Sequence, residues 1–153
     1  MCGVGRSIEY DGYCYGTVNN QSPDACDTIF AEGSNLATIN AMSTQGYLRD
    51  HMKILAIEYR PKYVIGLIYN GSEADTGAVE DMKWHGGTPV TYSNFLYPPD
   101  IMNSSGVYCV EMNWEDSLKW REFECDNEVV QRASLCEIGK KKVICAKLRL
   151  KIC

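Results

Sequence analysis

The sequence predicts a disulfide-bonded α+β domain, on three observations. Two helical patterns come early in the chain and several short strand patterns follow, an order typical of α+β folds rather than of alternating α/β folds. Glycine, proline and polar turn residues separate the strand patterns. Eight cysteines lie within 153 residues, a density typical of proteins held together by disulfides. A chain of this length is expected to form one domain around one core.

Charge and hydropathy exclude several classes of protein. The net charge is −5, and the first 139 residues hold all twenty acids but nine of the fifteen bases. Such an acidic body repels a phosphate backbone, so nucleic acid is not an expected partner. No apolar run approaches the roughly 18 residues needed to cross a bilayer. We therefore expect no membrane span.

The cysteines indicate disulfides rather than a metal site. A zinc site needs Cys-x-x-Cys pairs or clustered histidines, whereas the two histidines, His51 and His85, are far apart. Three Asn-X-Ser sequons, at Asn20, Asn70 and Asn103, are typical of a glycosylating route. Together these features predict a secreted or extracellular glycoprotein. No signal-peptide pattern opens the sequence, so we expect a mature fragment or a truncated sequence.

The N-terminal residues predict a β-hairpin. Asp11-Gly12 is a turn dipeptide between two short aromatic-rich segments. Cys2 and Cys14 lie on either side of this turn. The hairpin is therefore expected to be closed by its own disulfide.

A first helix is expected from Ser22 to Gly33. Ser22 is a favourable N-cap residue, and Pro23 suits the first helical position because it needs no hydrogen-bond partner there. Cys26 and Phe30 are four residues apart and so share one face of the helix. We expect that face to be buried.

A second helix is expected from about Ser43 to Ile54. Tyr47, Leu48, Met52 and Leu55 recur there at the three- and four-residue spacing of an apolar helix face. The other regular patterns are short strands. These strands are expected at residues 36–39, 63–67, 108–112, 119–123 and 134–137.

Residues 140–153 are predicted to form a basic tail after a domain that spans residues 1–139. The tail holds six of the fifteen bases and no acid. Cys145 and Cys153 are too far apart to bridge each other in an extended or helical segment. We expect them to be free or to link two copies of the chain into a disulfide-bonded dimer. A frayed tail without a role is the alternative.

A set of short motifs resembles one known family. The motifs are Gly12-Tyr13-Cys14-Tyr15, Cys26 with Phe30, Leu36-Ala37-Thr38-Ile39, Ile65-Gly66-Leu67, Trp84-His85-Gly86-Gly87, Tyr92-Ser93-Asn94-Phe95, Cys109-Val110, Lys119-Trp120 and Leu135-Cys136-Glu137. In this order and spacing, over roughly residues 2–138, the chain resembles the C-type lectin-like domain family in its long form. The resemblance implies two helices, small antiparallel sheets and a long ligand-binding loop.

The resemblance also implies how the cysteines pair. The implied disulfides are Cys2–Cys14, Cys26–Cys136 and Cys109–Cys125. Six cysteines allow fifteen pairings on arithmetic alone, so this choice comes from the family. In the loop-entropy model the longest bridge, which encloses most of the chain, contributes about 5 kcal/mol.

Members of the resembled family bind sugar through a calcium ion, a cation that takes about six to eight oxygen ligands. The resemblance places the first ligand motif at Pro98-Pro99-Asp100. Pro99 is then expected to be a cis proline and Asp100 a ligand, but Pro98 offers no side-chain oxygen. Val107 occupies a position at which the family usually has an acid.

The second ligand motif departs further from the family. Where the family has Trp-Asn-Asp, this chain has Trp120-Arg121-Glu122. Asp100 and Glu122 are the remaining calcium-ligand candidates, and the Arg121 cation stands where an amide oxygen belongs. Two unit charges 4 Å apart interact by about 4 kcal/mol at an effective dielectric near 20, and a divalent ion doubles this repulsion. We therefore expect no calcium site, with Arg121 paired to Asp100 or Glu122 instead.

The three tryptophans are expected to have different roles. Trp84 and Trp120 are assigned to the core, because an aromatic side chain buries a large apolar area. Trp114 lies beside Glu115 and Asp116 in a predicted loop, so it is the better candidate for a ligand contact.

Two alternative calcium sites remain open. Asn113, Glu115 and Asp116 could be ligands if the second motif is misaligned, although they lie nine or more residues before Cys125. A separate candidate set consists of Glu73, Asp75, Glu80 and Asp81. For this second set, a solvated acidic loop is the simpler interpretation.

The predicted function is ligand recognition outside the cell. We expect a module that binds a glycan or protein ligand without calcium or another cofactor, on a cell surface or in extracellular fluid. The expected binding residues are Pro99, Asp100, Trp114, Arg121 and Glu122. The alternative is a calcium-dependent lectin with atypical ligands. An enzyme is not expected, because the sequence contains no recognisable nucleophile, base and oxyanion arrangement.

Overall fold

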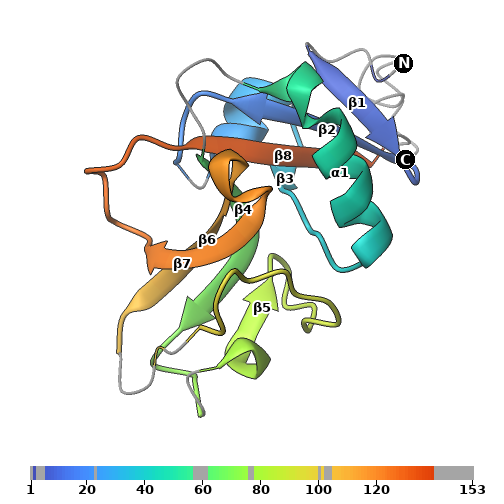
Figure 1. Ribbon diagram of the computed structural model, residues 1–153. Coiled ribbons are helices and arrows are strands. Elements are labelled where there is room, and N and C mark those ends of the chain that lie inside the picture. The colour runs from blue at the N-terminus through green and yellow to red at the C-terminus, as the bar shows by residue number, and fades with distance from the viewer. Residues whose placement is uncertain are drawn as a thin grey trace.

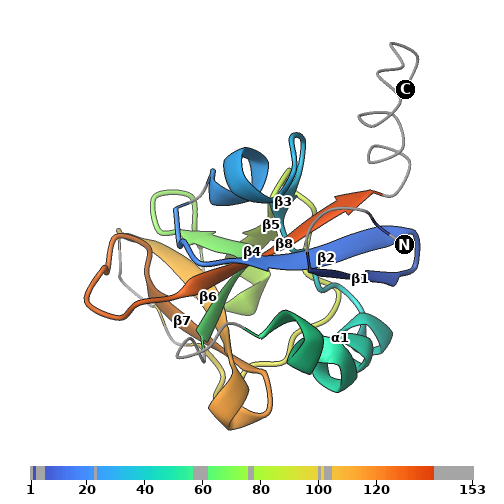
Figure 2. The ribbon, with the colours of Figure 1, turned by 90° about the horizontal axis from the view of Figure 1, so that it is seen from above.

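The computed structural model describes residues 2, 6–22, 24–56, 62–75, 78–99, 101 and 105–139. A mixed sheet crosses the molecule, and helix α1 (Met42–Leu55) packs on one side of it, next to strands β1 and β2 (Figures 1 and 2). The expectations for the tail, including those for Cys145 and Cys153, lie outside the described residues. Within the described part, no helix has the length and apolarity required to cross a membrane.

The sheet consists of two antiparallel groups. The strands are β1 (Ser7–Tyr10), β2 (Tyr13–Val18), β3 (Asn35–Leu36), β4 (Lys62–Asn70), β5 (Met82–Trp84), β6 (Val107–Asn113), β7 (Lys119–Glu124) and β8 (Ala133–Gly139). Strands β1, β2, β3 and β8 form one group, and β4, β5, β6 and β7 form the other. A short parallel contact between β4 and β8, at Tyr63 with Ala133 and Val64 with Ser134, joins the groups. The predicted fold is confirmed, but the expected small antiparallel sheets are joined by this contact into one mixed sheet.

The predicted N-terminal hairpin is confirmed as β1 and β2. Tyr10 and Tyr13 are paired across the turn. Asp11 and Gly12 both adopt positive φ angles, 47° and 77°, which a two-residue hairpin turn with the twist of the strands requires. Glycine adopts this conformation without steric cost, and aspartate tolerates it better than most residues.

The first helix is much shorter than the sequence predicts. It is a single π-helical turn, Cys26–Phe30, and Ala31 then returns to an extended conformation. Ser22 does not cap it, because its hydroxyl donates to the Asp24 carboxylate instead of accepting a backbone N–H. Pro23 lies outside the described residues. The prediction of a shared buried face is confirmed, since Cys26 and Phe30 belong to one apolar cluster.

Helix α1 agrees closely with its prediction, and its buried face contacts the core. Leu48, Met52 and Leu55 are fully buried and belong to one apolar cluster. Ile65 and Leu67 of β4 lie in the same cluster. Because these side chains recur every three or four residues along α1, a single helix face covers the sheet.

The strand expected at residues 36–39 is limited to β3. The next residue, Ala37, connects β8 to β4 through its backbone. Ala37 N donates to Leu135 O at 2.8 Å, and Ala37 O accepts from Gly66 N at 2.9 Å. A Cβ atom at Gly66 would lie 2.9 Å from the Leu36 oxygen. Glycine is therefore needed at this position of β4 because the two backbones approach too closely for a side chain.

All three implied disulfides are present. Their Cα–Cα distances are 5.7 Å for Cys2–Cys14, 5.4 Å for Cys26–Cys136 and 4.9 Å for Cys109–Cys125. The second bridge spans a sequence separation of 110 residues and ties the first helical turn to β8. The third joins the start of β6 to the residue after β7, at the open end of the β6–β7 hairpin.

Candidate ligand-binding surface around the β6–β7 hairpin

The turn between β6 and β7 is a tight structure with a constrained backbone. A 3₁₀ turn, Trp114–Asp116, follows β6. The next two residues, Ser117 and Leu118, have φ angles of 55° and 59°, in the left-handed region that side chains disfavour. Leu118 is held there by burial of its side chain and by its backbone N–H, which donates to Asn113 O at 2.8 Å.

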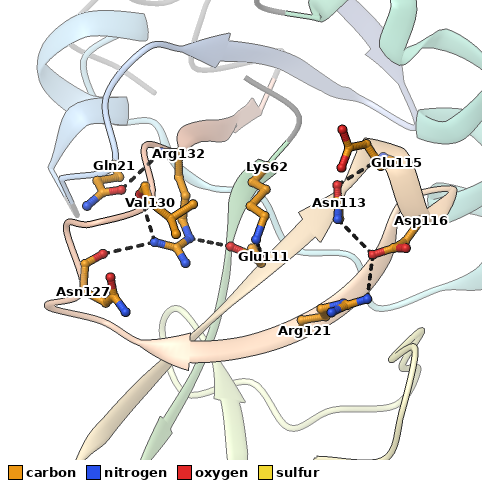
Figure 3. Close-up of polar contacts among 10 residues, drawn as sticks. All are labelled: Gln21, Lys62, Glu111, Asn113, Glu115, Asp116, Arg121, Asn127, Val130 and Arg132. Atoms are coloured by element: carbon orange, nitrogen blue, oxygen red, sulfur yellow. Dashed lines mark hydrogen bonds and ion pairs between the residues drawn. The ribbon is translucent and has the colours of Figure 1, made fainter. Parts of the chain in front are cut away.

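A chain of polar contacts runs across this turn (Figure 3). Asn113 Oδ1 accepts from Glu115 N at 3.1 Å, and Asn113 Nδ2 donates to Asp116 Oδ2 at 2.9 Å. The same carboxylate oxygen lies 3.0 Å from Nη2 of Arg121. Asp116 is thus held between an amide N–H and a guanidinium, which a carboxylate can accept together.

The structure corrects the predicted partner of Arg121. Glu122 is not the partner, because adjacent residues of a strand point to opposite faces and Arg121 reaches Asp116 instead. Asp100, the other predicted partner, lies outside the described residues. The alternative ligand set Asn113, Glu115 and Asp116 is brought together, but as a turn-capping unit in which Asn113 Oδ1 and Asp116 Oδ2 already accept from protein donors.

A buried ion network explains why Arg121 turns toward the hairpin end. Glu111 is the strand partner of Arg121 across β6 and β7. Its carboxylate, however, is engaged by Lys62 Nζ at 3.0 Å and by Arg132 Nε (Figure 3). Glu111 is therefore already paired to two cations, and within the described residues Arg121 forms its ion pair with Asp116.

Arg132 is almost fully buried and is held from several sides. Its Nη1 donates to Asn127 O at 3.0 Å and to Val130 O at 3.1 Å. Its guanidinium carbon lies 3.7 Å from the centroid of the Phe123 ring, a cation–π contact. Sequence reasoning missed this network. The available signal was Glu111 itself, an acid flanked by Val110 and Met112 in a predicted strand.

The long loop after β5 is attached to the outer edge of β7 through Trp120. Trp120 N donates to Asn94 O at 3.0 Å, and Leu96 N donates to Trp120 O at 3.0 Å. The Trp120 ring is fully buried and makes edge contacts with Trp84, Tyr92 and Phe95. The assignment of Trp84 and Trp120 to the core is confirmed, and Trp120 positions the loop against the hairpin.

The loop segment at residues 97–99 exposes an aromatic side chain that sequence reasoning missed. Pro99 is buried and its peptide bond is trans, since no peptide bond among the described residues is cis; the predicted cis proline is therefore wrong. Tyr97, two residues earlier, is 71% exposed. Trp114, predicted as a contact residue, is half-buried and packs against the core.

A second acidic region lies apart from the hairpin. A hollow of 480 Å³ lies between β4, β5 and the turn after β5. Its polar and charged lining residues are Asn70, Glu73, Asp75, Glu80, Asp81, Lys83 and His85. Among the described residues, no three acids, histidines or cysteines gather closely enough to hold a metal ion. Lys83 and His85 in the lining are also unlike the oxygen ligands that calcium prefers.

The sequons at Asn20 and Asn70 lie at the surface in similar local turns. Asn20 Oδ1 accepts from Ser22 N at 2.7 Å, and Asn70 Oδ1 accepts from Ser72 N at 3.2 Å. Asn103 lies outside the described residues. Glycosylation at the three positions stays a prediction.

Comparison with known proteins identifies the class of protein. The model of the Lectin C-type domain family matches residues 18–138. With its fold and three disulfides, the chain belongs to the C-type lectin domain family. A comparison with curated protein sequences found no significant match.

Solved structures with the same fold include calcium-independent proteins. Human lithostathine has a TM-score of 0.66 and 18% identity, with 88% of this chain and 97% of that chain covered. A calcium-independent type II antifreeze protein has a TM-score of 0.59 and 21% identity, over 88% and 92% of the chains. The calcium-independent C-type lectin SPL-2 from Saxidomus purpuratus has a TM-score of 0.63 and 20% identity, over 88% and 91%.

Proposed function

We propose that this protein is an extracellular recognition module that binds a glycan or protein ligand without calcium. The binding surface is formed by the β6–β7 turn and the adjacent long loop. The ion pair between Arg121 and Asp116 is the observation that carries this proposal. It places a permanent cation on the surface where the family's metal-binding motif aligns.

Electrostatics at this ion pair disfavour a divalent cation. Arg121 is protonated at every physiological pH, and its charge opposes a second cation a few ångströms away. Asp116 Oδ2 already accepts from Arg121 and Asn113, so a calcium ion could use this oxygen only by displacing both donors. The protein cation instead orders the turn, a role that a metal could otherwise fill.

Surface chemistry supports binding of a polar, partly aromatic-stacking ligand. Tyr97 is exposed, Trp114 is partly buried, and Arg121 has 45% of its side chain accessible. Aromatic rings with a polar edge and guanidinium groups are frequent at binding hot spots. We include Pro99, Asp100 and Glu122 in the proposed surface from the sequence motif, with Tyr97 added from its exposure.

Two of the similar structures support the absence of a calcium requirement. The antifreeze protein and SPL-2 are both described as calcium-independent. At about 20% identity they share the fold with this chain, and their ligands are not transferred to it. They demonstrate that this fold persists in proteins without a calcium requirement.

The alternative function is a calcium-dependent lectin with atypical ligands. Its ligands would be Asn113, Glu115 and Asp116. The side-chain oxygen of Asn113 accepts from the backbone of Glu115, and Asp116 accepts from Arg121. We therefore place this function second, because two of its three ligands already accept hydrogen bonds from protein donors and a cation lies beside one of them.

We further propose that the domain spans residues 1–139, that residues 140–153 form a distinct basic tail, and that the protein is secreted and glycosylated. The proposed partners are glycans or proteins outside the cell. Disulfide-linked dimers through Cys145 or Cys153 belong to the same proposal. A non-reducing gel of the full chain that contains monomer alone would contradict the dimer.

Calcium dependence is tested by thermal unfolding in millimolar calcium and in excess chelator. A ligand that binds the folded state at a hundred times its dissociation constant adds about 2.7 kcal/mol, which shifts the melting temperature by several degrees. We expect no shift for the wild-type protein. A calcium-induced rise would contradict the proposal and support the alternative lectin.

Ligand binding is tested on glycan and extracellular-protein arrays, each in calcium and in chelator. We expect at least one bound ligand whose signal survives the chelator and falls in Tyr97→Ala and Arg121→Gln. Ile29→Ala is the matched control, because Ile29 is 58% exposed but lies on the first helical turn. Equal loss in all three variants, or a signal abolished by chelator, would contradict the assigned surface.

A further inference from the structure

A second pocket lies beside the N-terminus of α1, next to the proposed surface but formed by other residues. Strands β2 and β8, the β1–β2 turn, the segment before α1 and Thr88 of the long loop surround it. Its volume is 330 Å³, which suits a small organic group rather than one ion. The lining residues are Asp11, Tyr13, Tyr15, Thr38, Asn40, Ala41, Thr44, Thr88 and Glu137.

The sheet register explains how the pocket forms. Tyr15 is the strand partner of Glu137, and Tyr13 is the partner of Gly139. Residues two apart on a strand point to the same face, so both tyrosines stand beside Glu137. A Cβ atom at Gly139 would meet no atom within 4 Å. The absence of a side chain at Gly139 therefore leaves open space beside the ring of Tyr13.

The two tyrosine rings form a partial aromatic wall. Their centroids are 6.4 Å apart and their planes are inclined by 41°. Tyr13 is 44% exposed, whereas Tyr15 is buried. An inclined pair with one ring accessible can contact a ligand through a ring face, and the negative face of an aromatic ring attracts cations.

The charged side chains that line the pocket are all acidic. Asp11 and Glu137 are acids, and none of the lining residues is a base. The N-terminus of α1 adds a partial positive charge of about one half, which the two carboxylates outweigh when ionised. Burial raises the pKa of Glu137 to about 7, so an isolated carboxylate is disfavoured there. Burial, followed by Glu137, Tyr13 and Asp11, also raises the pKa of Tyr15.

From the tyrosine wall, the two carboxyl groups and the open space over Gly139, we propose that this pocket binds a primary ammonium group, carried by a small amine or by a lysine side chain. A primary ammonium has three donors, which match the carboxylates and the hydroxyl groups of Thr38, Thr44 and Thr88. Its methylene stem lies against the Tyr13 ring. A neutral sugar would leave the acidic groups uncompensated, and a divalent metal would find two carboxylates in a space far larger than itself.

The test is a titration of the ¹⁵N-labelled full chain with n-butylamine and with Nα-acetyl-lysine methylamide, at about pH 8 so that Glu137 is ionised. We expect saturable shifts of the backbone amides of Tyr13, Thr38, Glu137 and Gly139. The uncharged Nα-acetyl-norleucine methylamide should cause none. Shifts centred on residues 70–87, absence of saturation, or equal binding of the uncharged probe would overturn the proposal.

Variants separate the pocket from general attraction to an acidic protein. Glu137→Gln should weaken amine binding about tenfold, because one charge-assisted hydrogen bond is lost. Tyr13→Leu should weaken it severalfold, and Tyr13 is exposed enough for the fold to survive. Glu128→Gln, an exposed acid after β7, is the matched control and should bind as the wild type does. Wild-type affinity in Glu137→Gln would overturn the proposal.

The source of the ammonium group is distinguished by a tail variant. In the full chain with Lys140, Lys141 and Lys142 replaced by glutamine, tighter binding of n-butylamine would identify a tail lysine as the natural occupant. Unchanged binding would identify an external amine. Loss of binding in this variant would contradict a pocket built from Tyr13 and Glu137.

Discussion

The indole N–H of Trp120 donates to Oε1 of Gln45 at 2.9 Å, a buried contact between β7 and α1. Gln45 Nε2 also donates to Leu118 O at 3.3 Å. One buried amide therefore satisfies a donor of the aromatic cluster and an acceptor in the left-handed turn. This residue connects α1 to both parts of the proposed surface, the hairpin turn and the loop held by Trp120.

We predict that Gln45→Leu lowers the free energy of unfolding by about 1–3 kcal/mol, because it leaves the buried indole N–H of Trp120 unpaired, whereas Leu118 O keeps a donor in Asn94 Nδ2. Urea denaturation measures this loss. The loop at residues 94–99 should also become more susceptible to protease. Met42→Leu, at the exposed start of α1, is the control and should change neither quantity. A neutral effect of Gln45→Leu would show that the amide does not support the surface.

We predict that Glu111→Gln lowers the free energy of unfolding by about 3–5 kcal/mol, because Arg132 would remain buried without its counter-ion. Lys62 is affected less, since 28% of its side chain is accessible. A double variant, Glu111→Leu with Arg132→Met, should be closer to the wild type because no buried charge remains. Urea denaturation of the wild type, Glu111→Gln and the double variant tests this prediction. A double variant that is less stable than Glu111→Gln would contradict the explanation by an unpaired buried charge.

We predict a pH-dependent difference between the wild type and Glu137→Gln. Burial raises the pKa of Glu137 from 4.5 to about 7, against two hydrogen bonds from Thr38 that lower it. The folded state therefore holds the proton more tightly than the unfolded state. This stabilisation is complete below pH 4.5 and is lost as the pH rises through about 7. Relative to the variant, the wild type should lose up to about 3 kcal/mol across this window.

The measurement is urea denaturation of both proteins at several pH values, with an NMR titration of the Glu137 carboxyl carbon. The groups that face Glu137 are Asp11, Tyr13 and Tyr15. The Tyr15 phenol stays neutral in this window, because burial raises its pKa further above its usual value. The raised pKa of Glu137 would be contradicted if the free energies of unfolding of the two proteins changed with pH in the same way. A carboxyl titration with a midpoint near 4.5 would also contradict it.

Local patterns predicted the elements whose side chains repeat along one face. The apolar spacing in α1 and the turn dipeptide Asp11-Gly12 carry their information within a few residues, so both elements were predicted nearly to their ends. The predicted extent of the first helix was wrong, because its start depends on which hydrogen bond the side chain of Ser22 makes. Ser22 bonds to Asp24 rather than to the backbone, and a pattern of residue types does not contain that choice.

The proposed surface was predicted less completely than the fold. The sequence placed Arg121 in the degenerate ligand motif, but its partner Asp116 depends on how the β6–β7 turn closes. The exposure of Tyr97 and the burial of Pro99 depend on where the loop meets Trp120. These are contacts between segments, and their geometry is absent from any single segment.

The sequence by itself determined the second helix and the hairpin, because residue type and spacing carry both, and its motifs identified the family. The disulfide pairs and the departure from the calcium-ligand pattern then followed from what the resemblance to that family implies. The tertiary structure alone decided how the charges pair. Glu111 of β6 joins Lys62 of β4 and Arg132, the residue before β8, and Glu137 meets Tyr13 and Tyr15 at a pocket next to Gly139. Electrostatic energy depends on distance and burial, and both quantities exist only once the strands are in register.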